Sequence, residues 1–457
     1  MDAATTLSKN RQIPLMTAIC LGAFTSHFTA GVVNVSLPHL SDLFGTNLNI
    51  IQWITIGYLL VIAALLPIMG SLGDRVGHRF IHNLGYIIFT ISSLLVAISS
   101  NLFMLLVLRV IQAIGAAMFQ ATNIALISIH IPKENRGHAL GLISTVVALG
   151  AMTGPIAGGF IAEWFSWEWL FLCHVPIMLL ASILAIRFIP FHNKKQVKKS
   201  FDIIGMLLFC GGVISFIFGI TFMNTWGVIS AKTILVMIVS LISILLFWLW
   251  ESHHTSPFLS VQLFRSPTVL FGLIISINTF LLANIALVVM PFYLSHVKHL
   301  SPAKAGYVII AYPAVLAAVG TLAGRLSDRY GSTPFMMVGL CSILLGFLSG
   351  LFILHSSSII GVIIVLAFIG LGMGLIASPN NRIIIEHTPK KLVGTVGGMI
   401  ALTRNLGMVL GASIGLSFLD YSIISTGTFR PIFVFGLCLS LASMLVLRLS
   451  FGKNPIN

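Results

Sequence analysis

The eight residues Gly70–Gly77 read GSLGDRVG, and a related copy, GRLSDRYG, occupies Gly324–Gly331. Five of the eight positions are identical, and the two copies start 254 residues apart. Each copy follows the second long apolar segment of a block of six, and the two blocks begin near residues 13 and 269. Because the spacing of the copies matches the spacing of the blocks, the sequence predicts a duplicated chain with two related halves.

Long apolar segments surround both copies. A helix needs about 20 apolar residues to cross a bilayer. Fourteen segments meet this requirement: 13–36, 49–69, 81–99, 101–125, 139–161, 168–189, 201–222, 231–250, 269–291, 304–323, 335–353, 358–380, 392–418 and 429–449. We therefore expect an all-α integral membrane protein with fourteen transmembrane helices. Its expected parts are a six-helix bundle at 1–189, a linker with two inserted helices at 190–268, and a second six-helix bundle at 269–457.

The composition supports a membrane location. Charged residues make up 8% of the 457 residues, and hydrophobic types make up 57%. Soluble domains carry roughly 25% charged residues, so the sequence excludes an ordinary water-soluble enzyme. The net charge of +14 comes from short basic runs between apolar segments, which is typical of cytoplasmic loops rather than of nucleic-acid binding. With the N-terminus inside, 19 Lys and Arg face the cytoplasm and 4 face outward, which predicts cytoplasmic termini in a multi-pass cell-membrane protein.

Several kinds of chemistry have no support in the sequence. The 5 cysteines are isolated within apolar segments, so we expect neither disulfides nor a metal site. We find no clustered nucleophile and base and no nucleotide-binding P-loop. The sequence therefore predicts a monomeric transporter that needs no cofactor and no ATP, rather than an enzyme or a sensor.

Ionisable side chains inside membrane segments are costly and tend to be functional. Arg109 shares one helix face with three amides, because spacings of three and four residues align them. Those amides are Gln112, Gln120 and Asn123. In the first segment His27 shares a face with Asn34, and an imidazole titrates near neutral pH. These residues could line a substrate cavity and couple protonation to transport, or they could serve only as hydrogen bonds between helices.

Further candidates lie elsewhere in the chain. Glu163 follows the segment 139–161 on the outer side, and it is the best acidic candidate for a proton carrier; a solvated helix end is the alternative. In the second half the cavity candidates are Asn278, Asn284, Arg404 and Asn405. Each of them is equally consistent with a helix-to-helix hydrogen bond.

Small and charged residues predict conformational gates. Glycines recur every four residues in the segment 139–161, which favours close helix contact, and a proline among them permits a bend. In the repeated octapeptide, glycines let helix ends approach closely, and the charges could form a latch, although an ordinary polar turn is the alternative. The predicted gate residues are Gly70, Asp74, Arg75, Gly77, Arg79, Gly150, Gly154, Pro155, Gly158, Gly159, Asp328 and Arg329.

Taken in chain order, these motifs resemble the major facilitator superfamily, and within it the fourteen-span drug/proton antiporters of the EmrB/QacA type. Gly70–Arg79 is similar to the loop signature between spans two and three, and Arg109–Gly115 to the fourth-span motif. Gly150–Gly159 is similar to the antiporter signature of span five. The resemblance implies a major facilitator fold and export of drugs or dyes across the lipid bilayer in exchange for protons.

The chain departs from that subfamily at the first span. Thr29 stands where an Asp usually precedes the Asn of a VNVALP-like run, so His27 could take over the missing proton site. Without that acid, the cavity lacks the usual counter-charge for cations. We therefore expect neutral, zwitterionic or singly charged amphipathic substrates, such as fluoroquinolones or dyes, rather than dications. The alternative on the same fold is a proton-coupled exporter or symporter of one specific lipid or metabolite.

Overall fold

The computed structural model describes residues 9–132, 136–190, 202–254, 266–353, 358–388, 393–419 and 429–451. In these ranges all regular secondary structure is helical. The first half of the chain contains α1 (Lys9–Leu43), α2 (Leu48–Ile51), α3 (Trp53–Val76), α4 (His78–Ala97), α5 (Leu102–His130), α6 (Arg136–Trp164), α7 (Trp169–Leu172) and α8 (Val175–Phe188). After these come α9 (Ile203–Trp226), α10 (Ala231–His253), α11 (Pro267–Phe292), η3 (Tyr293–Val297), α12 (Pro302–Ile309), α13 (Ala311–Tyr330), α14 (Ser332–Ile353), α15 (Ile359–Glu386), α16 (Val393–Ser417) and α17 (Arg430–Phe451).

Within these ranges, 13 helical segments are long and apolar enough to cross a membrane. The remaining expected segment, 139–161, lies on α6. Polar side chains mark where several helices begin: Asn101 accepts a hydrogen bond from the backbone N–H of Met104 at 2.8 Å. Such caps satisfy backbone groups that the first helical turn leaves unpaired. After Pro291, which lacks a backbone N–H, α11 continues into the short π-helix η3.

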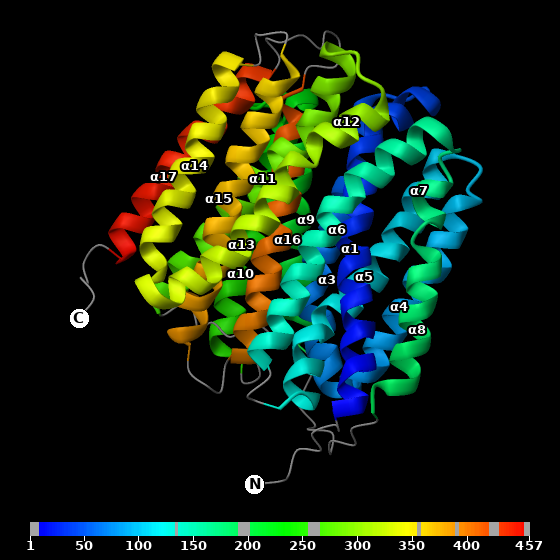
Figure 1. Cartoon of the computed structure of the whole chain (residues 1–457), viewed down its shortest axis with the longest axis vertical. Coiled ribbons are helices and arrows are strands. Elements are labelled where there is room, and N and C mark those ends of the chain that lie inside the picture. The colour runs from blue at the N-terminus through cyan, green and yellow to red at the C-terminus, as the bar shows by residue number, and fades with distance from the viewer. Residues whose placement is uncertain are drawn as a thin grey trace.

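The two halves of the chain pack in the same pattern. In the first half α1 lies against α6, and α5 lies against both α3 and α4. In the second half α11 lies against α16, and α15 lies against both α13 and α14. Figure 1 shows the blue-to-cyan helices on one side of the molecule and the yellow-to-red helices on the other. The packing is therefore duplicated along with the sequence.

Both octapeptides form the same type of connection. Each ends at a glycine with positive φ, 109° at Gly77 and 83° at Gly331. Residues with a side chain avoid this backbone region, so glycine is required there. Gly77 links α3 to α4, and Gly331 links α13 to α14 at the corresponding place in the second half.

The helices α9 and α10 pack against each other and meet the rest of the molecule through α9, which contacts α3 and α16. The ring of Trp53 on α3 stacks on Phe222, with centroids 5.8 Å apart. The hydroxyl of Ser417 on α16 donates to the carbonyl of Ile220 at 3.1 Å. This pair of helices therefore touches both halves of the chain. The division into bundles at 1–189 and 269–457 with a linker at 190–268 stays a prediction.

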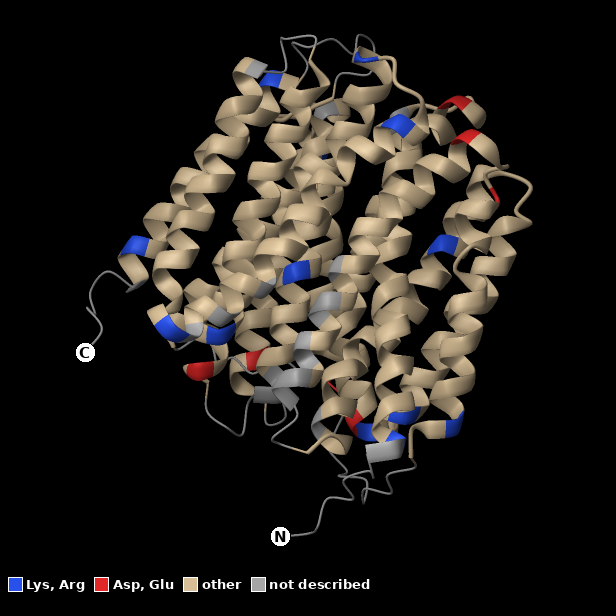
Figure 2. Cartoon of the chain, in the orientation of Figure 1, with Lys and Arg blue, Asp and Glu red and all other residues tan. Residues whose placement is uncertain are grey.

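Charges gather at the two ends of the helices. In Figure 2 the red acidic segments lie at the top and bottom, and only blue basic segments occur in the middle. We call the end with Gly77 and Gly331 the motif end, and the end with Glu163 and Pro302 the opposite end. Between them the surface exposes large apolar side chains, including Leu235 and Leu445, as lipid contact requires. The lengths and apolar character of these helices are those of a protein that crosses a membrane many times.

Candidate functional site

The glycines of α6 lie directly against the backbone of α1. A Cβ atom at Gly150, Gly154 or Gly158 would lie 2.5, 2.7 or 2.3 Å from a carbonyl oxygen of α1. Real Cβ atoms do not approach so closely, so only glycine permits this contact. The three glycines form a tight seam inside the first half, and their role in a gate stays a prediction.

The second half contains the same seam, which the sequence analysis missed. A Cβ atom at Gly407 or Gly411 of α16 would lie 2.5 Å from the carbonyl oxygen of Ile277 or Leu281 on α11. The sequence did contain an indication of this second seam. Gly407 and Gly411 are four residues apart, and each follows Gly150 or Gly154 by nearly the same number of residues that separates the two octapeptides.

At the opposite end, α6 also meets α12 of the second half. A Cβ atom at Gly159 would lie 2.3 Å from the carbonyl oxygen of Pro302, and one at Gly306 would lie 2.5 Å from that of Pro155. One face of the segment Gly150–Gly159 therefore packs against α1, and another face packs against α12. We call the contact of α6 with α12 the α6–α12 seam.

One turn further along α6, Glu163 extends this seam. Its carboxylate Oε2 accepts a hydrogen bond from the backbone N–H of Ala303 at 3.0 Å, at the start of α12. Glu163 lies beyond the membrane segment and is exposed. The neighbouring Ser301 hydroxyl and Ala303 N–H lower the pKa of Glu163, and Lys304 acts in the same direction. This setting favours the ionised carboxylate and fastens the two halves together, while the proton-carrier role stays a prediction.

A cavity of about 170 Å³ lies beside the α6–α12 seam, between α1 and the region from α11 to α12. It is lined by Val35, Pro38, His39, Asp42, Pro291, Ser295, Pro302 and Ala305. His39 and Asp42 were not candidates from the sequence. The sequence feature that could have identified them is their position, one and two turns after the candidate Asn34 on the same helix, α1.

Arg109 lies inside the first half. Its Nε donates to the carbonyl of Ile54 at 3.2 Å, and its guanidinium also donates to Gln112. The guanidinium carbon lies 4.0 Å from the ring centroid of Tyr58, within the range of a cation–π contact. Gln112 in turn donates to Ser93 at 2.6 Å. These partners belong to α3, α4 and α5, so Arg109 joins helices of one bundle. Its role in proton coupling stays a prediction.

The remaining polar candidates of the first half connect α1 with its neighbours. Gln120 donates to the Ser26 hydroxyl at 2.7 Å. The amide oxygen of Asn34 accepts from Thr55 at 2.9 Å, and Asn123 is buried on α5.

His27 and Arg404 belong to different halves of the chain. The Nδ1 of His27 lies 3.0 Å from the carbonyl oxygen of Ala23, on its own helix α1. His27 is also within electrostatic range of Arg404 on α16. Of the predicted candidates, these two therefore place an imidazole and a guanidinium from different halves within electrostatic range of each other.

The three amides of the second half have partners within that half. Asn278 donates to Ser443 at 3.1 Å. The other two side chains donate to backbone carbonyls: Asn284 to that of Met408 at 2.5 Å, and Asn405 to that of Ala401 at 2.8 Å. These contacts join α11 to α17 and α16, or lie within α16. A role in a substrate cavity stays a prediction for each.

The charges of the first octapeptide find partners at the motif end. Asp74 pairs with His78, 3.1 Å away and four residues later, rather than with a neighbouring Arg. Arg79 donates to the carbonyl of Ile186 on α8 at 2.7 Å, which ties the start of α4 to the end of the first half. Arg75 lies in the last turn of α3, and the Cβ position of Gly70 has no atom within 4 Å.

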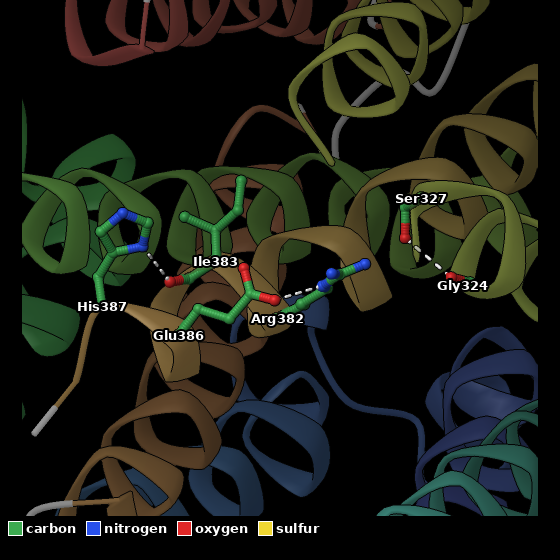
Figure 3. Close-up of polar contacts among 6 residues, drawn as sticks. All are labelled: Gly324, Ser327, Arg382, Ile383, Glu386 and His387. Atoms are coloured by element: carbon green, nitrogen blue, oxygen red, sulfur yellow. Dashed lines mark hydrogen bonds and ion pairs between the residues drawn. The ribbon is translucent and has the colours of Figure 1, made fainter. Parts of the chain in front are cut away.

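The second octapeptide lies near another set of contacts, drawn in Figure 3. There Ser327 donates to the carbonyl of Gly324 at 2.9 Å, and Arg382 pairs with Glu386 at 2.6 Å on α15. Arg329 lies 5.5 Å from the ring centroid of Tyr330. The side chain of Asp328 lies outside the described part, so the predicted latch is described only for the first copy.

Residues 19–412 match the Major Facilitator Superfamily. The chain belongs to this superfamily. Among its relatives is the riboflavin transporter RibZ of Clostridioides difficile (strain 630), which is 34% identical over 90% of this chain and 89% of the relative. The lincomycin resistance protein LmrB of Listeria innocua serovar 6a is 27% identical over 97% of this chain and 98% of the relative. The tetracenomycin C resistance and export protein of Streptomyces glaucescens is 26% identical over 89% of this chain and 76% of the relative.

Solved structures of the superfamily share the fold. The D-xylose–proton symporter superposes with a TM-score of 0.69 at 14% identity and covers 95% of this chain and 97% of its own. A mutant of the peptide transporter POT in complex with alafosfalin gives a TM-score of 0.71 at 14% identity, over 97% and 96% of the chains. Together with the family match, this makes the protein a small-molecule transporter and not an enzyme.

Proposed function

We propose that the protein exports amphipathic small molecules by alternating access, in exchange for protons. The observation that carries this proposal is the two-sided packing of Gly150–Gly159. One face holds α6 tightly to α1, so the first half moves as a unit, and the other face meets α12 of the second half. A rigid half that meets its partner along seams such as those of α6 with α12 and of α3 with α16 can rock about the interface, as duplicated transporters do.

Export of drugs fits the relatives, two of which are named for resistance to lincomycin or for resistance to and export of tetracenomycin C. We place the chain among the fourteen-span EmrB/QacA-type antiporters, as a monomer with both termini in the cytoplasm. The motif end then faces inward. The proton gradient supplies the energy without ATP. His27 is our leading proton-site candidate at the interface, because it is an imidazole within electrostatic range of Arg404 in the second half.

A second candidate is the transport of one specific metabolite. RibZ is named a riboflavin transporter, and its 34% identity extends over 90% of this chain. Riboflavin is itself an amphipathic aromatic compound, so a pocket for planar drugs and a pocket for such a metabolite require similar apolar walls.

Transport into inside-out membrane vesicles tests both candidates. Norfloxacin, ethidium and radiolabelled riboflavin are each offered to vesicles energised by respiration, with and without an uncoupler and with and without ATP. We expect the vesicles to take up norfloxacin and ethidium, and we expect the uncoupler to stop this uptake. In vesicles that lack the proton-pumping ATPase, ATP alone should not support uptake. Uptake of riboflavin alone would favour the metabolite transporter, and uptake that resists the uncoupler would contradict proton coupling.

A further inference from the structure

Arg404 brings a positive charge to the interface between the two halves. It lies in the middle of α16, two turns after Gly397. The Cβ position of Gly397 lies 3.1 Å from the side chain of Ile124 on α5, so this part of α16 packs against the first half. The guanidinium is also within electrostatic range of His27 on α1. Arg404 therefore lies among helices from both halves, where a transported molecule must pass.

The charge of Arg404 has no counter-charge among the described residues. Its Nε is buried and has no hydrogen-bond partner there. Ion pairs in the described part include those of Asp74 with His78 and of Arg382 with Glu386, and neither of these two includes Arg404. Acidic residues lie at the two ends of the helices in Figure 2, away from the middle. A guanidinium in an apolar interface is stable only when an anion or several acceptors pair with it.

The comparison with Arg109 shows what a structural arginine looks like in this molecule. Arg109 is equally isolated in an apolar helix, but it donates to a backbone carbonyl and to Gln112, and it lies over Tyr58. The fold supplies these contacts to Arg109 from within one half, although its Nη2 also lacks a hydrogen-bond partner among the described residues. No such contacts are found for Arg404 among the described residues. We therefore expect its partner to be a molecule that is not part of the chain.

Gln120, near His27, offers a second polar group to a bound molecule. Ser26, the preceding residue, accepts a hydrogen bond from Gln120 at 2.7 Å. The amide oxygen of Gln120 is buried and accepts no hydrogen bond from the described residues. The interface thus offers a cationic donor on α16 and a neutral acceptor on α5, and no negative charge between them among the described residues.

We propose that Arg404 binds the carboxylate of an amphipathic substrate, so that the preferred cargo is a monoanionic or zwitterionic acid. This inference rests on the proposed function, because it names the chemistry of the exported molecule. A carboxylate accepts two parallel hydrogen bonds from a guanidinium, and its single charge balances that of Arg404. A phosphate dianion would leave an excess negative charge, and a cationic substrate would gain no pairing with Arg404.

Neutralising Arg404 also connects binding to movement. When the halves close around an unpaired guanidinium, they remove it from water at a high cost in free energy. A bound carboxylate cancels that cost, so the loaded protein closes more readily than the empty one. The acid group of the substrate thereby serves both recognition and the change of access.

Binding to purified protein in nanodiscs tests the inference. Norfloxacin, which has a carboxylate, is compared with its methyl ester by isothermal titration at pH 7. We expect the wild type to bind the acid about 10- to 100-fold more tightly than the ester, as charge-assisted hydrogen bonds imply. Arg404→Gln should abolish this preference, and Arg404→Lys should retain part of it. Arg448→Gln removes an exposed arginine at the end of α17 and should leave the preference unchanged.

The outcomes separate the inference from the proposed function. Equal affinity of the wild type for acid and ester, no binding of the acid, or a preserved preference in Arg404→Gln would overturn the role of Arg404. If Arg404→Gln does not fold, the wild type and Arg404→Lys still decide the matter. Proton-driven uptake is measured separately in vesicles, so an exporter that takes up acid and ester equally would retain its function and lose this specificity.

Discussion

Replacing Gly158 by Ala tests whether the contact of α6 with α1 is needed for a stable first half. The new Cβ atom would lie 2.3 Å from the carbonyl oxygen of Val32 and 2.8 Å from its Cα. Ordinary contacts of a Cβ atom begin near 3.4 Å. The two helices must therefore separate by about 1 Å along this seam, in an interior that is packed without voids.

The size of the effect follows from two opposing contributions. Overpacking of this kind costs about 1–3 kcal/mol. Alanine recovers about 0.5–1 kcal/mol, because it loses less backbone entropy than glycine when a helix forms. Separation of the helices also stretches the hydrogen bond that the Ser36 hydroxyl donates to the carbonyl of Gly158 at 3.2 Å. We expect a net loss of about 1–2 kcal/mol in the free energy of unfolding.

Thermal unfolding of the purified protein in detergent, followed by intrinsic fluorescence, measures this loss. Gly398→Ala is the matched control, because a Cβ atom at Gly398 on α16 would have no other atom within 4 Å. Gly158→Ala should lower the melting temperature by about 1–2 °C, while Gly398→Ala should leave it unchanged or raise it. If both variants melt at the same temperature, the argument from close packing is refuted.

Three further predictions concern charged and titratable groups. Because Ser301 and Ala303 lower the pKa of Glu163, the ionised carboxylate stabilises the α6–α12 seam above the ordinary carboxyl pKa, and this stability is lost as the pH falls through the lowered pKa. Glu163→Gln should therefore remove the dependence of the melting temperature on acid pH. If wild type and Glu163→Gln give the same profile of melting temperature against pH, the argument for the seam fails. Arg109→Lys should lower the free energy of unfolding by about 1–3 kcal/mol, because an ammonium cannot reach the Ile54 carbonyl and Gln112 while it lies over Tyr58. The melting temperature of Arg109→Lys, compared with that of the control Arg448→Lys, measures this loss. His27→Ala should abolish pH-driven efflux while norfloxacin binding persists, and normal drug uptake in response to an imposed pH gradient would reject His27 as the proton site.

Sequence reasoning worked best where composition alone decides the outcome. An apolar segment of about 20 residues must form a helix in lipid, because its backbone groups have no other partners there. The repeat of GSLGDRVG as GRLSDRYG indicated two related halves, and the structure shows the same connection at Gly77 and Gly331. Both features are local: they depend on the residues of one segment and not on what that segment touches.

The seams show where local reasoning stops. The sequence pointed to Gly150, Gly154 and Gly158 because a small residue at every fourth position favours close contact in any helix. It could not reveal that α6 also meets α12, since the α6–α12 seam joins residues about 140 positions apart, such as Glu163 and Ala303. The equivalent glycines of α16 were overlooked because many glycines share apolar segments, and only the packing shows which of them a backbone approaches.

From the sequence, Arg109 and Arg404 share one feature: each is the one arginine of a long, mostly apolar helix. A helix that is apolar on all sides gives no indication of which face meets its own bundle and which meets the other half. Tertiary packing turned Arg109 toward Tyr58 and Gln112, and it placed Arg404 near His27 at the interface. Membrane insertion thus depends on how apolar each segment is, whereas the site depends on helix rotation and neighbours, which only the assembled fold determines.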